Sequence, residues 1–327
     1  AQWLASDRFE RYLTGMKIIR DYIYVDPEGK GASGAVGNFD GVHLGHQSVI
    51  DLARQTAEAI SAPLGILTFE PHPRSYFAPQ SPAFRLMSSE ARATRLAKLD
   101  VDLLYELNFN TSLSSLTPRE FAQNVIADGL GLSHLVVGAD FCFGKGRAGT
   151  VEDLQHFGAE MGFGVTVAPL IEAGEGQVSS TSIRSALAEG RPRDAATQLG
   201  HWHRIEGIVI GGEQRGRELG YPTANMSLEG LHLPKLGVYA VLVDVLDGPF
   251  QGSYHGAASL GVRPMFGENT PNLETFIFDF SGDLYGSNLS VALVDFLRPE
   301  LKFDGLEALI EQMQRDCDQA RKTLAAL

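Results

Sequence analysis

Two patterns of secondary structure divide this chain of 327 residues. Between about residues 33 and 168, short apolar runs bounded by turn residues alternate with helical stretches. The runs that indicate strands are Leu64–Phe69, Val101–Leu107, His134–Gly138 and Gly164–Ala168. Such alternation predicts a parallel sheet with helices on both faces and with ligands at the carboxyl ends of its strands. We therefore predict an α/β domain in the first half of the chain.

Capping residues indicate where helices of this domain begin. The predicted capping boxes pair residues three apart, Thr117 with Glu120 and Thr150 with Asp153. In such a box each side chain bonds the backbone N–H of the other residue, which satisfies groups left unpaired at a helix start. Ser89 is predicted to start a further helix over Glu90–Leu99.

After Gly190 strand-like runs follow one another without helices between them. They are Ile205–Ile210, Val238–Val245, His255–Leu260, Glu274–Phe280 and Leu289–Leu297. This pattern predicts an all-β antiparallel sheet or barrel. The chain closes with a helical pattern over Leu306–Leu327, preceded by Gly305, whose apolar stripe is Leu306, Leu309, Ile310, Met313 and Cys317.

These patterns place a domain boundary near Gly190–Gly200. We predict an α/β domain over residues 16–190 and a barrel domain over residues 200–327. Residues 1–15 match no strand or site pattern and are treated as an extension without assigned chemistry. His201, Trp202 and His203 at the junction are expected to pack or cap rather than to catalyse.

Charge and composition exclude several classes of protein. The net charge is −13 and the pI is near 5.1, which argues against a nucleic-acid or membrane-surface binder because both need a basic face. No apolar run approaches the roughly 18 residues needed to span a bilayer, and no signal-peptide pattern is evident. Cys142 and Cys317 cannot build a disulfide framework. A cytoplasmic protein, monomeric or weakly homo-oligomeric, is expected.

The first candidate site is the segment Gly-Asn-Phe-Asp-Gly-Val-His-Leu-Gly-His at residues 37–46. It leaves a predicted strand and enters a helix predicted over Gly45–Ile60, where unpaired N–H groups and the helix dipole favour a polyphosphate. His43 and His46 lie three apart on one helix face and can address one phosphate. Gly45 between them would let a nucleotide approach the backbone. The alternative is two ordinary histidines at a helix start, and zinc is disfavoured for want of further ligands.

Three further segments of interest follow this motif along the first half of the chain. They are residues 69–74 after the second predicted strand, residues 138–147 in a Gly/Phe-rich loop, and Ser-Ser-Thr-Ser-Ile-Arg at residues 179–184. Hydroxyl groups at a helix N-terminus followed by an arginine suit the β- and γ-phosphates of a nucleotide. Taken alone, the last segment is equally well a plain helix cap with a surface arginine.

Together these segments resemble the HxGH-type nucleotidyltransferases, specifically the adenylyltransferase half of bacterial riboflavin kinase/FAD synthetases. The resemblance implies a Rossmann-like domain in which His43, His46 and Arg184 are catalytic. The implied nucleotide-binding residues are Gly37, Asn38, Asp40, Gly45, Asp140, Ser180 and Thr181, and the implied flavin-binding residues are Phe69 and His72. Cys142 and Thr150 depart from residues common in that family, so no role is carried over to them.

The second candidate site begins with a glycine-dense, charged loop at residues 211–217 after the strand over Ile205–Ile210. It is not a Walker A loop, because no Gly-Lys-Ser/Thr closes it. In the extended segment that follows, Thr223 and Asn225 lie two apart and point to the same side. A hydroxyl and an amide oxygen are ligands that suit Mg²⁺, which keeps waters and phosphates in its other positions. As an isolated fragment this segment is a turn.

Glu274 is the candidate general base of the second site. Strand alternation places it on one face with Phe276, Phe278 and Phe280, where desolvation would raise the pKa of its carboxyl. Asp279, on the other face, is expected to be a solvated charge. The alternative is a glutamate at a strand end beside a turn.

The segment Gly-Arg-Glu-Leu-Gly-Tyr-Pro-Thr-Ala-Asn at residues 216–225 resembles the riboflavin kinase signature, and later segments match in order. The resemblance implies that Glu274 accepts the proton of the ribityl 5′-hydroxyl. It also implies nucleotide binding by Gly211, Arg217 and Gly220, and flavin binding by Arg263 and Arg298. Met265 stands where many relatives have threonine, so a hydroxyl role is absent there.

The resemblance covers about residues 16–327 and implies a bifunctional enzyme. The barrel would phosphorylate riboflavin with Mg²⁺ and ATP to give FMN, and the α/β domain would transfer AMP from a second ATP to FMN, giving FAD. Three alternatives stay open: an enzyme with one inactive site, a flavin-binding sensor without turnover, and an adenylyltransferase for another phosphate-bearing substrate with an unrelated barrel.

Overall fold

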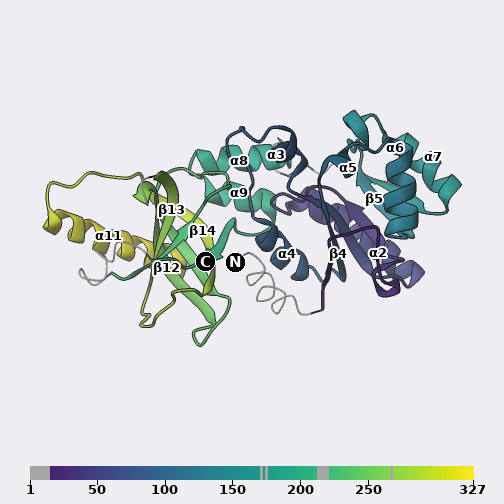
Figure 1. Cartoon of the computed structure of the whole chain (residues 1–327). Helices are drawn as coiled ribbons and strands as arrows, with labels where there is room; N and C mark the ends of the chain where they lie inside the picture. The colour runs from purple at the N-terminus through teal and green to yellow at the C-terminus, as the bar shows by residue number, and fades with distance from the viewer. Residues whose placement is uncertain (1–14, 170–171, 174–175, 212–220, 266–267) are drawn as a thin grey trace. The chain divides into compact units, whose positions relative to one another are not determined.

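The computed structural model describes residues 15–169, 172–173, 176–211, 221–265 and 268–327 (Figure 1). The predicted extension, apart from Gly15, and the predicted nucleotide-binding residues Arg217 and Gly220 lie outside these residues. The chain forms two compact units. The first contains the described residues up to Pro82 and Arg92–Val178, and the second contains Ala83–Ala91 and Ser179–Leu327. This division falls before the boundary predicted at Gly190–Gly200.

A six-stranded parallel sheet forms the first unit, in the order β1-β4-β3-β2-β5-β6. The strands are β1 (Lys17–Ile19), β2 (Ser33–Val36), β3 (Leu64–Glu70), β4 (Leu103–Asn108), β5 (His134–Gly138) and β6 (Gly164–Ala168). The predicted α/β, Rossmann-like class is confirmed. The edge strand β1 was not predicted, because three residues are too few to show a period.

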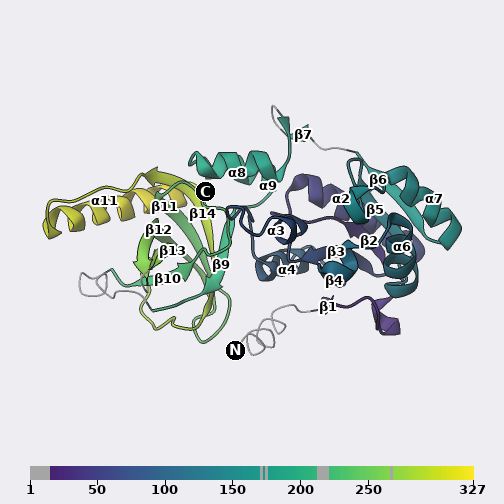
Figure 2. The same ribbon diagram turned by 45° about the horizontal axis from the view of Figure 1, so that its top comes forward.

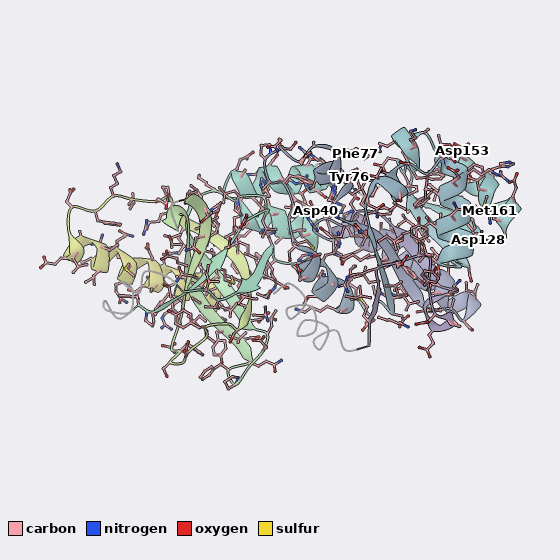
Figure 3. The ribbon with its side chains drawn as sticks, in the orientation of Figure 1. Asp40, Tyr76, Phe77, Asp128, Asp153 and Met161 are labelled. Atoms are coloured by element: carbon pink, nitrogen blue, oxygen red, sulfur yellow. The ribbon has the colours of Figure 1, made fainter. Side chains whose placement is uncertain are left out.

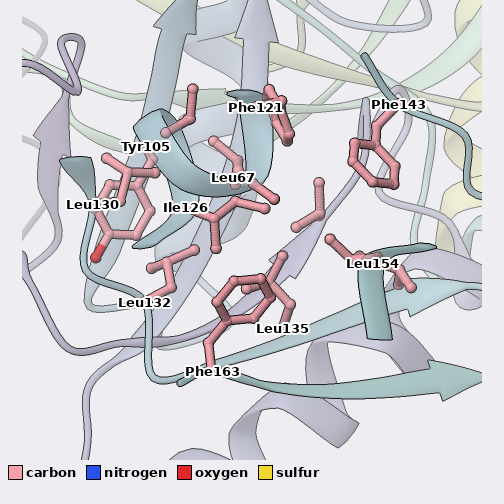
Figure 4. Close-up of a cluster of buried hydrophobic side chains, with 14 of the residues drawn as sticks. Leu67, Tyr105, Phe121, Ile126, Leu130, Leu132, Leu135, Phe143, Leu154 and Phe163 are labelled. Carbon is pink, nitrogen blue, oxygen red and sulfur yellow. The ribbon is translucent and has the colours of Figure 1, made fainter. Parts of the chain in front are cut away.

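Helices cover both faces of this sheet (Figures 1 and 2). The helical elements are η2 (Pro27–Gly29), α2 (Leu44–Ile60), α3 (Pro73–Phe77), α4 (Ser89–Ala97), α5 (Thr111–Ser114), α6 (Pro118–Glu120), η3 (Phe121–Gly129), η4 (Lys145–Arg147) and α7 (Val151–Met161). On one face η3 and α7 close over Leu67, Tyr105 and Leu135 (Figure 4). Helix α2 packs on β2, β3 and β5 through other buried residues, Ile50, Ala53 and Ala57.

The predicted helix starts are confirmed, with one correction. Thr117 and Thr150 each form the expected capping box, with Glu120 and Asp153 respectively, at α6 and α7. Ser89 does not cap its helix. The helix begins at Ser89 itself, and the hydroxyl of Ser88 accepts a hydrogen bond from the backbone N–H of Ala91 at 3.1 Å. The two adjacent serines made the capping position ambiguous by one residue.

The core of the second unit is a six-stranded antiparallel sheet in the order β10-β13-β12-β11-β14-β9. Its strands are β9 (Arg204–Ile208), β10 (Thr223–Ser227), β11 (Gly237–Val245), β12 (Gly252–Met265), β13 (Glu268–Ile277) and β14 (Asn288–Arg298). Two residues past β9, the backbone N–H of Ile210 donates to the carbonyl of Asn225 on β10 at 2.9 Å, and this isolated bridge closes the predicted barrel. Strand β13 starts six residues earlier than the predicted run Glu274–Phe280 and ends three residues earlier. The early end follows from Asp279, whose φ of 56° is not that of a strand.

Helices α8 (Ser180–Ala188) and α9 (Pro192–Leu199) lie side by side in the second unit (Figures 1 and 2). Their apolar faces share a buried cluster with Leu86 from the segment Ala83–Ala91. This segment also bonds the barrel, because the N–H of His232 donates to the carbonyl of Arg85 at 2.7 Å. A two-stranded ribbon, β7 (Glu172–Ala173) with β8 (Gly176–Gln177), precedes α8.

The last helix, α11 (Leu306–Ala325), matches the predicted one closely, but its apolar stripe is only partly buried. Cys317, Ala320 and Leu324 pack against the barrel, whereas Leu306 is exposed. The contact is therefore made by the second half of the helix. None of the described helices is both long and apolar enough to cross a membrane.

Candidate functional sites

Three of the segments singled out in the first half leave neighbouring strands. Residues 37–46 follow β2, residues 69–74 overlap the end of β3, and residues 138–147 follow β5. Strand β2 lies between β3 and β5, and all three are parallel, so the segments emerge at the same edge of the sheet. The strand order reverses between β2 and β5, which is the position where open α/β sheets bind ligands.

The spacing of His43 and His46 has a local structural reason. His43 is the N-cap residue of α2, and its Nδ1 accepts a hydrogen bond from the backbone N–H of His46 at 3.3 Å. An N-cap side chain reaches the N–H group two or three residues on, so the pair stands at a fixed separation. Because Nδ1 of His43 is an acceptor, the proton of the neutral ring lies on Nε2, which is then a donor.

The two imidazole rings are stacked, with centroids 3.7 Å apart and planes 15° apart. Burial, followed by the neighbouring His43, holds the pKa of His46 well below 6.5. Nδ1 of His46 is buried and has no hydrogen-bond partner among the described residues. His46 is therefore neutral at pH 7, and the pair offers hydrogen bonds to a phosphate rather than two full positive charges.

The loop between β2 and α2 has a strained backbone. Phe39, Gly41 and Val42 have φ values of 49°, 89° and 44°. Such angles are rare for a bulky or β-branched residue and occur mostly at functional sites. Phe39 and Val42 are 1% and 0% exposed, so burial of their side chains holds the loop in this form.

The structure gives Gly45 a local reason of its own, and the predicted approach of a nucleotide to its backbone stays a prediction. A Cβ at this position would lie 3.2 Å from Nδ1 and Cε1 of His43, closer than ordinary contact. The nearest neighbour of the glycine is thus the imidazole of His43. The absence of a side chain lets that ring fold back over the first turn of α2.

A buried arginine that the sequence analysis missed supports the same loop. Arg92 on α4 is 1% exposed and bonds Glu106 at 2.8 Å and Glu70 at 3.1 Å through Nη2. Its Nη1 donates to the carbonyl of Asn38 at 3.3 Å, and the hydroxyl of Thr68 donates to the same oxygen. In sequence, Arg92 is one of several charges on a short polar helix, and nothing marks it as buried.

The predicted flavin-binding residues of the first unit lie beside an aromatic cluster. Phe69 packs edge to face against Phe109, with centroids 5.7 Å apart, and Tyr76 and Phe77 contact Phe109 in the same way. Figure 3 labels Tyr76 and Phe77 on α3. Phe77 is 67% exposed. The buried His72 caps α3 by accepting a hydrogen bond from the N–H of Arg74 at 3.0 Å. Tyr76, Phe77 and Phe109 were not among the predicted residues.

The remaining predicted residues of the first unit lie in the loops after β2 and β5. Gly37 and Asn38 start the β2–α2 loop, Asp40 within it is buried, and Asp140 is exposed in the turn after β5. Thr150 caps α7, and the thiol of Cys142 lies 3.6 Å from the carbonyl of Asp140. No role was carried over from the family resemblance to Thr150 or Cys142, and the cap at Thr150 is the one predicted from its pairing with Asp153.

Ser180, Thr181 and Arg184 lie on α8 and so belong to the second unit. The cap of this helix is Ser179, paired with Ser182, so Ser180 and Thr181 stand in its first turn. Nε of Arg184 donates to the carbonyl of Phe84 at 2.6 Å, and the guanidinium lies 5.4 Å from the centre of the Phe84 ring. These three residues therefore belong to a different unit from His43 and His46.

The barrel brings the second set of predicted residues together. Asn225 on β10 lies opposite Glu274 on β13 in the antiparallel ladder, and Thr223 is two residues from Asn225 on the same strand. Between Asn225 and Glu274 stands Asn272, which is 4% exposed. Its Nδ2 lies 3.0 Å from Oδ1 of Asn225 and 3.4 Å from Oε1 of Glu274. Residues two apart on a strand lie on the same face, so the sequence already indicated that Asn272 is a neighbour of Glu274.

The predicted row of phenylalanines on the face of Glu274 is only partly correct. Phe276 and Phe278 pack together, with centroids 5.9 Å apart. Phe280 instead contacts Phe250 and Tyr254 in another cluster, because the strand ends before Asp279 and the alternation stops. Asp279 is exposed as expected, and its ion pair with Arg321 lowers the pKa of its carboxyl.

Three further predicted residues of the second site lie in the described part of the barrel. Gly211 is exposed beyond the end of β9, and Arg263 lies on β12. Arg298 at the end of β14 bonds both carboxylate oxygens of Asp316 on α11, with distances from 2.7 to 3.1 Å. This ion pair ties α11 to the barrel. Binding of flavin by Arg263 and Arg298 stays a prediction.

Comparisons with known proteins agree with the two-part organisation. The model of the FAD synthetase family matches residues 26–182, and the model of the riboflavin kinase family matches residues 199–324. A protein of Pseudomonas fluorescens described as bifunctional riboflavin kinase/FMN adenylyltransferase is 40% identical over 311 residues, which are 95% of this chain and 98% of its own. Proteins of Listeria monocytogenes and Bacillus subtilis with the same description are 38% and 36% identical, over 90% and 88% of this chain and 92% and 90% of their own.

A solved structure also matches over both parts. It is described as a macrolide-efflux protein from Streptococcus pneumoniae, with a TM-score of 0.80 and 31% identity over 94% of this chain and 99% of its own.

Proposed function

The chain belongs to the family of bifunctional riboflavin kinase/FMN adenylyltransferases, and from this premise we propose how its residues divide two successive reactions. The barrel phosphorylates riboflavin with ATP, giving FMN and ADP. The α/β part transfers AMP from a second ATP to FMN, giving FAD and pyrophosphate. The observation that supports this division is that the two compact units carry separate clusters, His43 with His46 and Asn225 with Glu274.

In the kinase reaction Glu274 accepts the proton of the ribityl 5′-hydroxyl. The oxygen attacks the γ-phosphorus of ATP, a new P–O bond forms, and the bond to the β–γ bridging oxygen breaks as ADP leaves. The carboxylate of Glu274 is held in place by its strand and by a hydrogen bond from the amide of Asn272. This suits a general base, because proton transfer requires the base to lie within hydrogen-bond reach of the hydroxyl.

Thr223 and Asn225 are proposed to hold the magnesium ion that accompanies ATP. Both offer uncharged oxygen atoms from one strand, which fits the preference of Mg²⁺ for hard ligands. The ion would neutralise charge on the phosphates. Among the described residues there is no cluster of three or more His, Cys, Asp or Glu that could hold a metal alone, and in this proposal phosphates and water complete the coordination.

In the adenylyl transfer an oxygen of the FMN phosphate attacks the α-phosphorus of ATP, and the bond from this phosphorus to the α–β bridging oxygen breaks as pyrophosphate leaves. The nucleophile is already ionised, so the site must align the phosphates and stabilise developing charge. His43 and His46 supply hydrogen bonds at the start of α2. Phosphate binding by Ser180, Thr181 and Arg184, which belong to the second unit, stays a prediction. The exposed Phe77 extends the flavin-binding surface predicted at Phe69 and His72.

The activity is tested by incubating the purified chain with riboflavin, ATP and Mg²⁺ and separating FMN and FAD over time. FMN should appear first and FAD afterwards. Absence of FMN would contradict the kinase assignment. Absence of FAD when FMN is supplied would contradict the adenylyltransferase assignment.

Reciprocal substitutions test the assignment of the residues. Glu274→Gln should stop phosphorylation of riboflavin and leave adenylylation of supplied FMN largely intact, because the amide cannot accept the proton. His46→Ala should do the reverse. Both rates are measured on each folded variant, and loss of both reactions from either single substitution would show that the two-site division is wrong.

A further inference from the structure

Asn272 occupies the point between the proposed metal ligand and the proposed base of the kinase site. Its Nδ2 carries two hydrogens and faces two acceptors, Oδ1 of Asn225 at 3.0 Å and Oε1 of Glu274 at 3.4 Å. The first bond crosses from β13 to β10, and the second runs along β13. One amide group therefore links two strands and two functional side chains.

The carbonyl oxygen of the Asn272 amide is in an unfavourable environment. Oδ1 is buried and has no hydrogen-bond partner among the described residues. An unpaired buried acceptor costs roughly 1–3 kcal/mol, and native proteins seldom keep one without a reason. Rotating the amide by 180° would bring Oδ1 against two oxygen atoms and break both bonds. The two acceptors thus fix the orientation of the group.

We propose that Asn272 is a positioning residue for phosphoryl transfer. It holds the amide of Asn225 and the carboxylate of Glu274 in one mutual orientation, so that metal binding and proton acceptance depend on the same donor. Hydrogen bonds to the groups that bind a metal orient them, and their loss typically weakens metal binding or activity about 10- to 100-fold. The inference rests on the proposed kinase function of the barrel.

Asn272→Asp tests the donor without changing the size of the side chain. The carboxylate cannot donate, so it removes both bonds and faces Asn225 and Glu274 with oxygen atoms. We expect phosphorylation of riboflavin to slow at least tenfold and adenylylation of supplied FMN to stay unchanged. In the presence of ADP, the Mg²⁺ concentration that half-protects the β10 amides from hydrogen exchange should rise about tenfold or more. Asn272→Ala should show the same direction in both measurements.

Asn288→Ala is the matched control. Its Nδ2 donates to Asp247 in the same barrel at 2.7 Å, so this variant also loses an amide–carboxylate bond, and neither Asn288 nor Asp247 belongs to the proposed site. Its phosphorylation rate and Mg²⁺ dependence should match those of the unmodified chain. The β11 amides report folding of each variant in the same exchange experiment.

Three results would overturn the proposal. If the phosphorylation rate and the half-protecting Mg²⁺ concentration of Asn272→Asp both stay within twofold of those of the unmodified chain, Asn272 only packs. A slower reaction with unchanged Mg²⁺ dependence would show that Asn225 is not involved. Loss of protection throughout the barrel in Asn272→Asp would show a structural role. Failure of the unmodified chain to form FMN would instead contradict the kinase function itself.

Discussion

At the scale of single residues, Gly45 connects backbone geometry with the chemistry of His43. In Gly45→Ala the new methyl group lies 3.2 Å from the His43 ring and must displace it. Relief of this contact takes a shift of a few tenths of an ångström, which is less than the 1 Å misplacement that can cost on the order of 100-fold in rate. Alanine favours the helix by about 1 kcal/mol, so instability does not explain a loss. We therefore expect adenylylation of FMN to fall about threefold and phosphorylation of riboflavin to stay unchanged.

The control for this substitution is Gly34→Ala on β2. A Cβ there would meet Leu132 at 3.4 Å, an ordinary contact, in the same unit. Both rates should stay near those of the unmodified chain. Equal loss of adenylylation in the two variants would contradict the role assigned to the ring of His43.

Single residues also show where sequence reasoning reached its limit. The pairs His43–His46 and Thr223–Asn225 could be found because their spacing matches a helix start and a strand. Arg92 could not be found, because its burial depends on Glu106 and Glu70, which lie on two other elements. Long-range pairing of this kind leaves no period in a sequence.

At the scale of elements, a partly buried ion pair adds to the apolar packing that holds α11 on the barrel. The side chains of Arg298 and Asp316 are 17% and 9% exposed. Arg298→Met removes the ionic partner of the partly buried Asp316 carboxylate, to which the amide of Gln312 still donates at 2.8 Å, so we expect a cost of about 1–3 kcal/mol. We expect a lower urea midpoint and faster hydrogen exchange in Leu306–Ala325. Arg321→Met, which breaks the exposed pair with Asp279, should leave the midpoint nearly unchanged.

Equal shifts in these two arginine variants would contradict the idea that the Arg298 pair anchors the helix. The predicted flavin contact of Arg298 is tested separately by the KM for riboflavin. A contact with flavin would raise KM in Arg298→Met beyond any effect of Asp316→Asn, which also breaks the ion pair.

Most elements could be predicted, since strand–helix alternation, capping boxes and a run of strands are local signals. The errors have local causes as well. Strand β13 ends early because Asp279 adopts a left-handed conformation, and the first half of α11 exposes Leu306 because the barrel contacts only the second half. The assignment of α8 to the second unit depends on its contact with Leu86, which is distant in sequence.

At the scale of the whole molecule, acid should weaken the second unit through His203. Burial, followed by His201 and His232, lowers the pKa of His203 to about 3. The unfolded chain takes up this proton below about pH 6.5, whereas the folded chain does not. The contribution of neutral His203 to the free energy of unfolding is therefore complete above pH 6.5 and declines as the pH falls toward 3. At pH 5 the loss is about 2 kcal/mol.

Trp202, the neighbour of His203, reports this change by fluorescence in a Trp3→Phe background, because the chain has two tryptophans. Urea unfolding at pH 7 and pH 5 gives the difference in free energy. His203→Gln should remove most of the pH dependence. The same dependence in both proteins would show that other groups are responsible.

The chain passes between its two units three times, after Pro82, after Ala91 and after Val178. No single cut in the gene therefore yields both units complete. A fragment of residues 200–327 keeps its barrel core but loses the partners of His232 and Lys235, and should fold with a lower midpoint. A fragment ending at Val178 exposes Leu86 to solvent and should aggregate. Genetic dissection of the two activities is better achieved by point substitutions than by truncation.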